Sequence, residues 1–250
     1  MAAGVAASAE SAASAAPDGR RPRIAVVDYG AGNLVSIDQA LRAVGADVVL
    51  AHRPEGLADA DALIVPGVGA AAPAMNRLRR RRLLDPILAW LADDRPFLGI
   101  CLGLQLLFDA SDEDGARTFG VIPGRTRELR EAPRLPHIGW NQVDLRRDHA
   151  LFAGIPSGSN FYFVHSYAGV PEGPGADAMT LAETTHGRPF VSVVARGNLA
   201  GVQFHPERSG VDGLRLLGNF VRSLSVVASG SGPRAAASAA GLATAGARSA

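Results

Sequence analysis

The sequence predicts a doubly wound α/β domain, built on a mostly parallel sheet with antiparallel additions in its second half. The first half of the chain alternates short apolar segments with amphipathic helical segments, and such alternation produces a parallel sheet with helices on both faces. After Thr118 the pattern changes to short strands. The two ends, residues 1–22 and 227–250, are rich in Ala, Ser and Gly, so we expect disordered tails around one domain at 23–226.

The expected strands of the first half are apolar on both faces, as in a buried parallel sheet. They are Ile24–Asp28, Asp47–Leu50, Ala62–Val65 and Phe97–Ile100. Asn33 is expected to cap the helix after the first strand, because its side chain can accept from a free backbone N–H. A second helical stretch, Ala74 to Leu91, is expected to break near Pro86. A third helix is expected at Leu102–Phe108.

The second half is expected to add shorter strands and one closing helix. The strands are Gly139–Leu145, Asn160–Val164, Phe190–Ala195 and Leu199–Phe204, and the helix is Val211–Leu224.

Composition excludes several classes of function. The 25 basic residues, all of them Arg, nearly balance 24 acidic ones, so neither nucleic acid nor an anionic membrane is favoured as a partner. The absence of Lys excludes a lysine nucleophile. One cysteine permits no intramolecular disulfide and no multi-thiolate zinc site, which suits a cytoplasmic protein. No apolar run approaches the roughly 20 residues of a membrane span. The first residues lack a secretory signal pattern, and a transit peptide is disfavoured because its basic residues stand only at the end.

The sharpest local motif is Gly99-Ile100-Cys101-Leu102-Gly103, between an expected strand and an expected helix. A nucleophile elbow needs a strained turn there, with glycines two positions either side of the nucleophile. The following helix would supply backbone N–H groups for an oxyanion and lower the thiol pKa. The alternative is a buried core cysteine, but the glycine spacing favours catalysis.

A nucleophilic cysteine needs a base and usually a group that orients the base. His205 stands two residues before Glu207, and in an extended chain such residues point to the same side. Pro206 disfavours helix at His205. The carboxylate would hold the imidazole in the tautomer that accepts the thiol proton. A surface turn is the alternative, and the elbow cysteine argues against it.

Pro66-Gly67-Val68-Gly69 follows the third expected strand, where flexible glycines can turn a backbone N–H toward an oxyanion. The segment 67–72 also fits a dinucleotide fingerprint, but that motif belongs on the first strand of its unit. The segment 30–32 follows the first strand and lacks the third glycine. We therefore expect no cofactor.

The other candidate groups are more typical of structure than of chemistry. We interpret His165 as a hydrogen-bonded core histidine and Arg79–Arg82 as a solvated helix end. His52, His149 and His186 have no metal-ligand spacing, so no metal is expected.

Together these motifs resemble the class I glutamine amidotransferases, and within them the glutaminase subunits of imidazole glycerol phosphate synthases. The matching stretches run in order through most of the expected domain. They are Asp28–Asn33, Pro66–Gly69, Gly99–Phe108, Pro136–Asn141, Tyr162–Tyr167 and Gly201–Glu207. The Cys and His-x-Glu elements mark the superfamily, whereas Gly-Trp-Asn and Asp-Tyr-Gly-x-Gly-Asn are typical of this subunit.

The resemblance implies a flavodoxin-like fold and assigns roles by position. The implied catalytic triad is Cys101, His205 and Glu207. The oxyanion donors would be Val68, Gly69 and Leu102, and the glutamine contacts would be Gln105, Ser166 and Tyr167. Arg208 and Leu104 stand where the family usually has Lys and Met. Arg is not interchangeable with Lys at a point contact, whereas Leu for Met conserves volume.

The resemblance also implies a partner. Glutamine would be hydrolysed to glutamate and ammonia, and the ammonia would pass to a separate cyclase subunit that makes imidazole glycerol phosphate and AICAR in histidine biosynthesis. Asn33, Trp140 and Tyr162 would lie near the cyclase. The rival hypotheses are another hydrolase of the superfamily, such as a γ-glutamyl peptidase, and a catalytically inert flavodoxin-like binding subunit.

Overall fold

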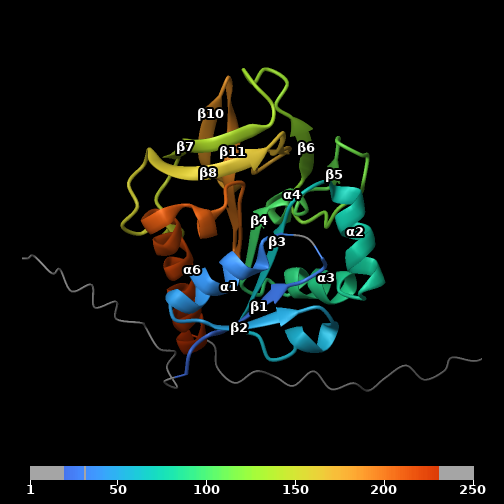
Figure 1. Ribbon diagram of the computed structural model, residues 1–250, viewed down its shortest axis with the longest axis vertical. Helices are drawn as coiled ribbons and strands as arrows, with labels where there is room; N and C mark the ends of the chain where they lie inside the picture. Colours follow the sequence, from blue (N-terminus) through green and yellow to red (C-terminus); the bar gives the residue numbers. More distant parts are fainter. Residues whose placement is uncertain (1–19, 31, 231–250) are drawn as a thin grey trace, which may run out of the picture.

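The computed structural model describes residues 20–30 and 32–230. The expected tails, 1–22 and 227–250, therefore fall mostly outside the described residues. One mixed sheet forms the centre of the molecule, with helices on both sides (Figure 1).

Five parallel strands occupy one half of the nine-stranded sheet, in the order β2-β1-β3-β4-β12. Their bounds are Asp47–Ala51, Arg23–Val27, Ala62–Gly67, Phe97–Cys101 and Leu199–Val202. This order is that of the flavodoxin-like doubly wound fold, in which ligands bind at the carboxyl ends of the strands. The expected fold class is confirmed, and the candidate residues after β3, β4 and β12 lie at one edge of the sheet.

Antiparallel strands continue the sheet in the order β11-β10-β7-β8. Their bounds are Arg188–Arg196, Thr180–His186, His137–Leu145 and Ser159–His165. A separate three-stranded sheet contains β5 (Ala110–Ser111), β6 (Gly124–Glu128) and β9 (Tyr167–Pro171). The sequence analysis missed β6, β9 and β10, because their polar and glycine-rich sequences lack the apolar alternation of a half-buried strand.

Helices α1 (Leu34–Ala43) and α6 (Gly210–Gly230) cover one face of the sheet, and α2 (Ala71–Arg80) and α3 (Leu84–Ala92) cover the other (Figure 1). Two apolar clusters fill the two interfaces. Asn33 caps α1 as expected, since its side chain accepts a hydrogen bond from the Ser36 N–H. The short helices are α4 (Leu102–Gln105), α5 (Ala176–Met179) and the 3₁₀ turns η1 (Pro54–Leu57), η2 (Ala150–Phe152) and η3 (Pro206–Arg208).

The expected helix Ala74–Leu91 is broken, but not at Pro86. Helix α2 ends in a Schellman motif: Arg82 has a φ of 59°, and the Leu83 N–H donates to the Leu78 carbonyl at 2.9 Å. Pro86 is instead the third residue of α3, where its missing N–H removes no intrahelical bond.

The helix expected at Leu102–Phe108 ends at Gln105. The carbonyls of Leu106 and Leu107 accept hydrogen bonds from Phe119 and Ile122 instead of from a further helical turn. In contrast, α6 continues past the expected end at Leu224 to Gly230. Among the described residues, no helix is both long enough and apolar enough to cross a membrane.

Candidate active site

Cys101 occupies a strained turn between β4 and α4. Its φ of 53° and ψ of −107° lie in a region that residues with a β-carbon rarely adopt. Such strain is found at functional sites, where the surrounding structure holds it. The thiol is buried and is the single free cysteine of the chain.

The two flanking glycines explain how the turn fits. A β-carbon at Gly99 would lie 2.5 Å from the Gly103 carbonyl oxygen, and one at Gly103 would lie 1.7 Å from the Val65 carbonyl oxygen. The predicted requirement for glycine two positions either side of the cysteine is therefore confirmed. Because α4 has only one turn, it offers backbone N–H groups rather than the dipole of a long helix.

His205 and Glu207 lie together at the carboxyl end of β12. The His205 Nδ1 and Glu207 Oε1 atoms are 2.8 Å apart, and both side chains are buried. The expectation of an extended chain is wrong beyond Pro206, because residues 206–208 form the 3₁₀ turn η3. The turn nevertheless brings the carboxylate to the ring, as predicted from the spacing.

The electrostatics favour a charged imidazole. Burial opposes protonation, but the interactions of the ring with Cys101 and then with Glu207 outweigh it and raise the pKa of His205 to about 10. Its Nε2 atom is buried and has no hydrogen-bond partner among the described residues. The site can thus hold a proton on His205, close to the sulfur of Cys101, at neutral pH.

A pocket of about 180 Å³ opens beside Cys101. Seven residues of its lining were predicted from the sequence: Val68, Gly69, Cys101, Leu102, Gln105, Ser166 and Tyr167. Gly67, Val68 and Gly69 are here called the oxyanion loop. Gly67 is the last residue of β3 and lies opposite Cys101 in the sheet register, and Val68 and Gly69 follow it. Val68 is exposed, and the φ of Gly69 is 86°. The predicted oxyanion and glutamine-contact residues therefore share one cavity with the thiol.

Gln203 is a site residue that the sequence analysis missed. Its side-chain amide donates to the Cys101 sulfur at 3.6 Å, and its oxygen accepts from Gln105 at 3.2 Å. Gln105 also donates to the Tyr167 carbonyl at 2.8 Å. The sequence did contain a signal for Gln203. It stands two positions before His205, which is the same spacing that pointed to Glu207.

Glu113, which also lines the pocket, was missed as well. Glu113 is exposed overall, but partial burial of its carboxyl group, and then the neighbouring Asp114, raises the pKa of that group. Asp114 accepts from the Ala72 N–H at 2.6 Å, which fixes this segment to the start of α2. A carboxylate at the pocket wall could pair with the ammonium group of an amino acid.

Two buried histidines form a chain of hydrogen bonds behind the pocket. The His165 Nδ1 atom lies 2.9 Å from the Tyr167 carbonyl, so it must donate. Its Nε2 atom then accepts from the His137 Nδ1 at 3.0 Å, and the His137 Nε2 accepts from Asn141 at 3.2 Å. Each neutral ring has one donor nitrogen and one acceptor nitrogen, and these hydrogen bonds use all four nitrogens of the two rings. The interpretation of His165 as a core histidine agrees with these contacts, although it also lines the pocket.

The two buried histidines predict that the protein loses stability in mild acid. Burial lowers the pKa of His165 to about 3 and that of His137 to about 4. Below the unfolded-state pKa of about 6.5 the unfolded chain binds protons that the folded chain does not, so stability falls as the pH falls. His165 alone should remove about 2 kcal/mol between pH 6.5 and pH 5. Urea unfolding across this range measures the slope, which His137→Asn should reduce. Equal stability at both pH values would contradict the assignment.

Trp140 and Tyr162 lie outside the pocket, beside the His205–Arg208 segment. The Tyr162 carbonyl accepts from the His205 N–H at 2.9 Å, and the two aromatic rings meet edge to face. The Arg208 guanidinium lies over the Tyr162 ring, 4.2 Å from its centre. Trp140 and Ile138 point to one side of β7 and are 58% and 60% exposed. Asn33 is also exposed, at the start of α1.

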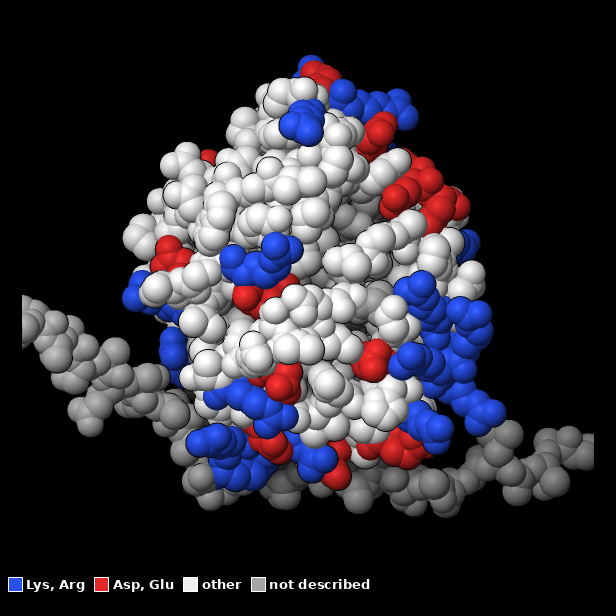
Figure 2. Space-filling model, viewed as in Figure 1, with Lys and Arg blue, Asp and Glu red and all other residues white. Residues whose placement is uncertain are grey.

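The arginine run at the end of α2 has two parts. Figure 2 shows basic side chains gathered on the flank where α2 lies in Figure 1. Arg79, Arg80 and Arg82 are exposed, as expected of a solvated helix end. Arg81, in contrast, donates to the Asp28 carbonyl at 2.5 Å, and the nearby Arg77 donates to the Gly30 carbonyl at 3.0 Å.

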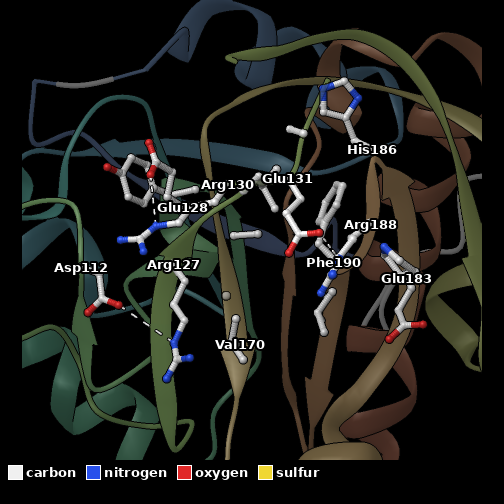
Figure 3. A pocket seen from close by; sticks show the side chains of 17 residues that line it. Asp112, Arg127, Glu128, Arg130, Glu131, Val170, Glu183, His186, Arg188 and Phe190 are labelled. Carbon is white, nitrogen blue, oxygen red and sulfur yellow. Dashed lines mark ion pairs between the residues drawn. The ribbon is translucent and has the colours of Figure 1, made fainter. Parts of the chain in front are cut away.

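A second cavity lies beyond β9, between the two sheets (Figure 3). Its charged side chains take part in ion pairs, among them Arg188 with Glu131, Arg130 with Glu128 and Arg127 with Asp112. We therefore place the candidate site at Cys101.

The model of the class-I glutamine amidotransferase family matches residues 25–224 of this sequence. The chain belongs to the class-I glutamine amidotransferase family. The matched span contains the strained cysteine, the His-Glu pair and all the residues that line the pocket beside Cys101. The resemblance inferred from the motifs is thereby confirmed.

Curated relatives within this family are similar over most of their length. The chain is 49% identical over 201 residues to the imidazole glycerol phosphate synthase subunit HisH of Symbiobacterium thermophilum, covering 80% of this chain and 93% of the relative. It is 48% identical over 203 residues to the subunit of the same name from Synechococcus sp. strain JA-3-3Ab, with the same coverage. Among solved structures, PurLQS from Thermotoga maritima superposes with a TM-score of 0.62 at 18% identity, covering 82% of this chain and 99% of that one. That likeness shows the fold.

Proposed function

We propose that this amidotransferase is the glutaminase subunit of an imidazole glycerol phosphate synthase, acting in the cytoplasm. It hydrolyses glutamine to glutamate and ammonia and passes the ammonia to a cyclase subunit in histidine biosynthesis. The observation that carries the proposal is the pocket in which a strained cysteine faces an oxyanion loop, beside a buried His-Glu pair. The high identity to the HisH subunits supports the pathway.

The chemistry follows from the proton that His205 holds beside Cys101. Cys101 attacks the side-chain amide carbon of glutamine as a thiolate, while His205 carries the proton. When the tetrahedral intermediate collapses, His205 gives that proton to the leaving ammonia. The neutral imidazole then takes a proton from water, which hydrolyses the γ-glutamyl thioester. Glu207 holds the ring in the required orientation through both steps.

The other pocket residues bind glutamine and stabilise the oxyanion that forms on it. The backbone N–H groups of Val68, Gly69 and Leu102 stabilise the developing oxyanion. Gln105, Ser166 and Tyr167 contact the amino-acid end of glutamine, and Glu113 pairs with its ammonium group. Gln203 holds both Gln105 and the thiol in place.

The proposed partner face contains Asn33, Ile138, Trp140, Tyr162 and Val211. Asn33 follows β1, and the Tyr162 backbone bonds His205 after β12, so both lie near the carboxyl ends of the parallel strands. Trp140 lies over the start of α6, 3.9 Å from the position of a β-carbon at Gly210. Val211 is 73% exposed, so together with Ile138 and Trp140 it gives this edge an apolar surface. Exposed apolar surface of this kind is typical of interaction sites. A cyclase docked here would receive ammonia close to its source.

We expect glutamine hydrolysis to depend on this partner. The glycines of the oxyanion loop allow its N–H groups to be held away from the substrate until docking. A shift of about 100-fold toward the competent loop conformation requires the cyclase to bind that conformation more tightly by roughly 2.7 kcal/mol. One buried aromatic side chain can supply this free energy. The measurement is steady-state turnover of the purified chain alone, then with its co-purified cyclase and the cyclase substrate.

Trp140→Ala should weaken this activation about tenfold or more, because truncation removes an interface anchor. Leu50→Ala, an exposed apolar residue in the edge strand β2, is the matched control and should not change activation. Equal turnover with and without the cyclase would favour a free-standing hydrolase.

A further inference from the structure

The hydroxyl of Tyr29 is buried and has no role in the chemistry described so far. The side chain is 1% exposed, and among the described residues its oxygen has no hydrogen-bond partner. Leaving a buried polar group unpaired is unfavourable, so such groups in folded proteins need an explanation.

The hydroxyl lies against the oxyanion loop. A β-carbon at Gly67 would be 2.0 Å from the Tyr29 oxygen and 3.1 Å from the β-carbon of Leu102. The hydroxyl therefore occupies the space that a side chain at Gly67 would fill. It sits between the two backbone segments that supply the proposed oxyanion donors.

The turn that carries Tyr29 is held by hydrogen bonds from arginines at the end of α2. Arg81 donates to the carbonyl of the preceding Asp28, and Arg77 donates to that of the following Gly30. The Gly30 N–H donates to the Asp28 side chain at 2.9 Å. A β-carbon at Gly32 would lie 3.8 Å from the Gly67 backbone, and Asn33 of the partner face follows directly. The backbone on both sides of Tyr29 is thus held in place, and the ring itself is buried.

We propose that Tyr29 is a positioning residue for the oxyanion loop, and that its hydroxyl donates a hydrogen bond to the Gly67 carbonyl in the competent conformation. This inference rests on the proposed glutaminase function. The carbonyl of Gly67 and the N–H of Val68 belong to one planar trans peptide and point in opposite directions. Rotating the peptide to aim the N–H at glutamine carries the carbonyl away from the pocket. The Tyr29 hydroxyl lies against Gly67 and outside the pocket lining, where it can donate to that carbonyl.

The local structure permits this rotation. Gly67 is the last residue of β3, so the peptide that follows lies beyond the sheet ladder. The rotation changes the ψ angle of Gly67, and glycine at this position removes the steric barrier that a side chain would impose there. The hydroxyl is unpaired before the rotation and paired after it, so its hydrogen bond favours the competent state alone.

The test is Tyr29→Phe in the complete chain, assayed with its cyclase and the cyclase substrate. The kcat for glutamine hydrolysis should fall about tenfold, equivalent to about 1.4 kcal/mol. The KM for glutamine should not change, because the hydroxyl does not line the pocket. The melting temperature should stay equal or rise, because the variant loses an unpaired polar group and keeps the ring. Ammonia-dependent cyclisation should be unaffected.

The matched control is Thr184→Val, which removes another buried hydroxyl without a described partner, in β10. It should leave kcat unchanged. A Tyr29→Phe variant with wild-type kcat would overturn the proposal, as would one that melts several degrees lower or fails to fold, since the hydroxyl would then be structural. If the wild-type complex itself showed no glutaminase activity, the proposed function would fail instead.

Discussion

Cys101→Ala should abolish glutamine-dependent synthesis in the complex with the cyclase, while synthesis from free ammonia continues. The loss of glutamine hydrolysis should exceed about a thousandfold, because a catalytic nucleophile is removed and the remaining groups cannot form the thioester. The side chain is buried and small, and alanine keeps its β-carbon at the strained turn. The fold should therefore be preserved.

The two activities are measured on the same purified complex, with glutamine and with an ammonium salt as alternative nitrogen sources. Free ammonia reaches the cyclase without the thiol, so the second activity is the internal control for folding and assembly. Glutamine hydrolysis above a thousandth of wild type would exclude Cys101 as the nucleophile.

Glu207→Gln should lower kcat for glutamine hydrolysis by at least about 100-fold, because an amide cannot supply the charge that orients and stabilises the imidazolium. Glu207 contributes to the raised pKa of His205, so the variant should also shift the acidity of the ring toward its ordinary value. The change conserves shape in a buried position.

The kinetic comparison uses Glu172→Gln as a matched control. Glu172 pairs with Arg127 at 2.6 Å on the surface, and such exposed pairs contribute little. The control should keep wild-type kcat. If Glu207→Gln did the same, the ring would need no orienting carboxylate and the proposed mechanism would be wrong.

The parts of the site that the sequence predicts are the local ones. The glycines around Cys101 are required within one strand-turn-helix unit, so their spacing alone indicates the elbow. The His205–Glu207 contact spans two residues and follows from their separation, even though the turn between them is 3₁₀ rather than extended. The parallel half of the sheet was predictable for a similar reason, since each of its strands carries its own apolar pattern.

The parts that the sequence does not predict depend on strand pairing. His137 and His165 meet because β7 and β8 pair in the register that sets these two residues opposite each other. Tyr29 reaches Gly67 because β1 lies beside β3. Glu113 reaches the pocket through a segment anchored on α2 by its neighbour Asp114. No local pattern specifies such distant pairings.

The most direct measurement for the central claim is covalent labelling with a glutamine analogue that carries a diazoketone in place of the side-chain amide. Because the chain has one cysteine, peptide mass spectrometry of the labelled complex gives an unambiguous site. We expect one adduct per chain on Cys101, slowed by excess glutamine and absent from Cys101→Ala. An unlabelled thiol in an active complex, or an adduct on another residue, would contradict the assignment of Cys101 as the glutaminase nucleophile.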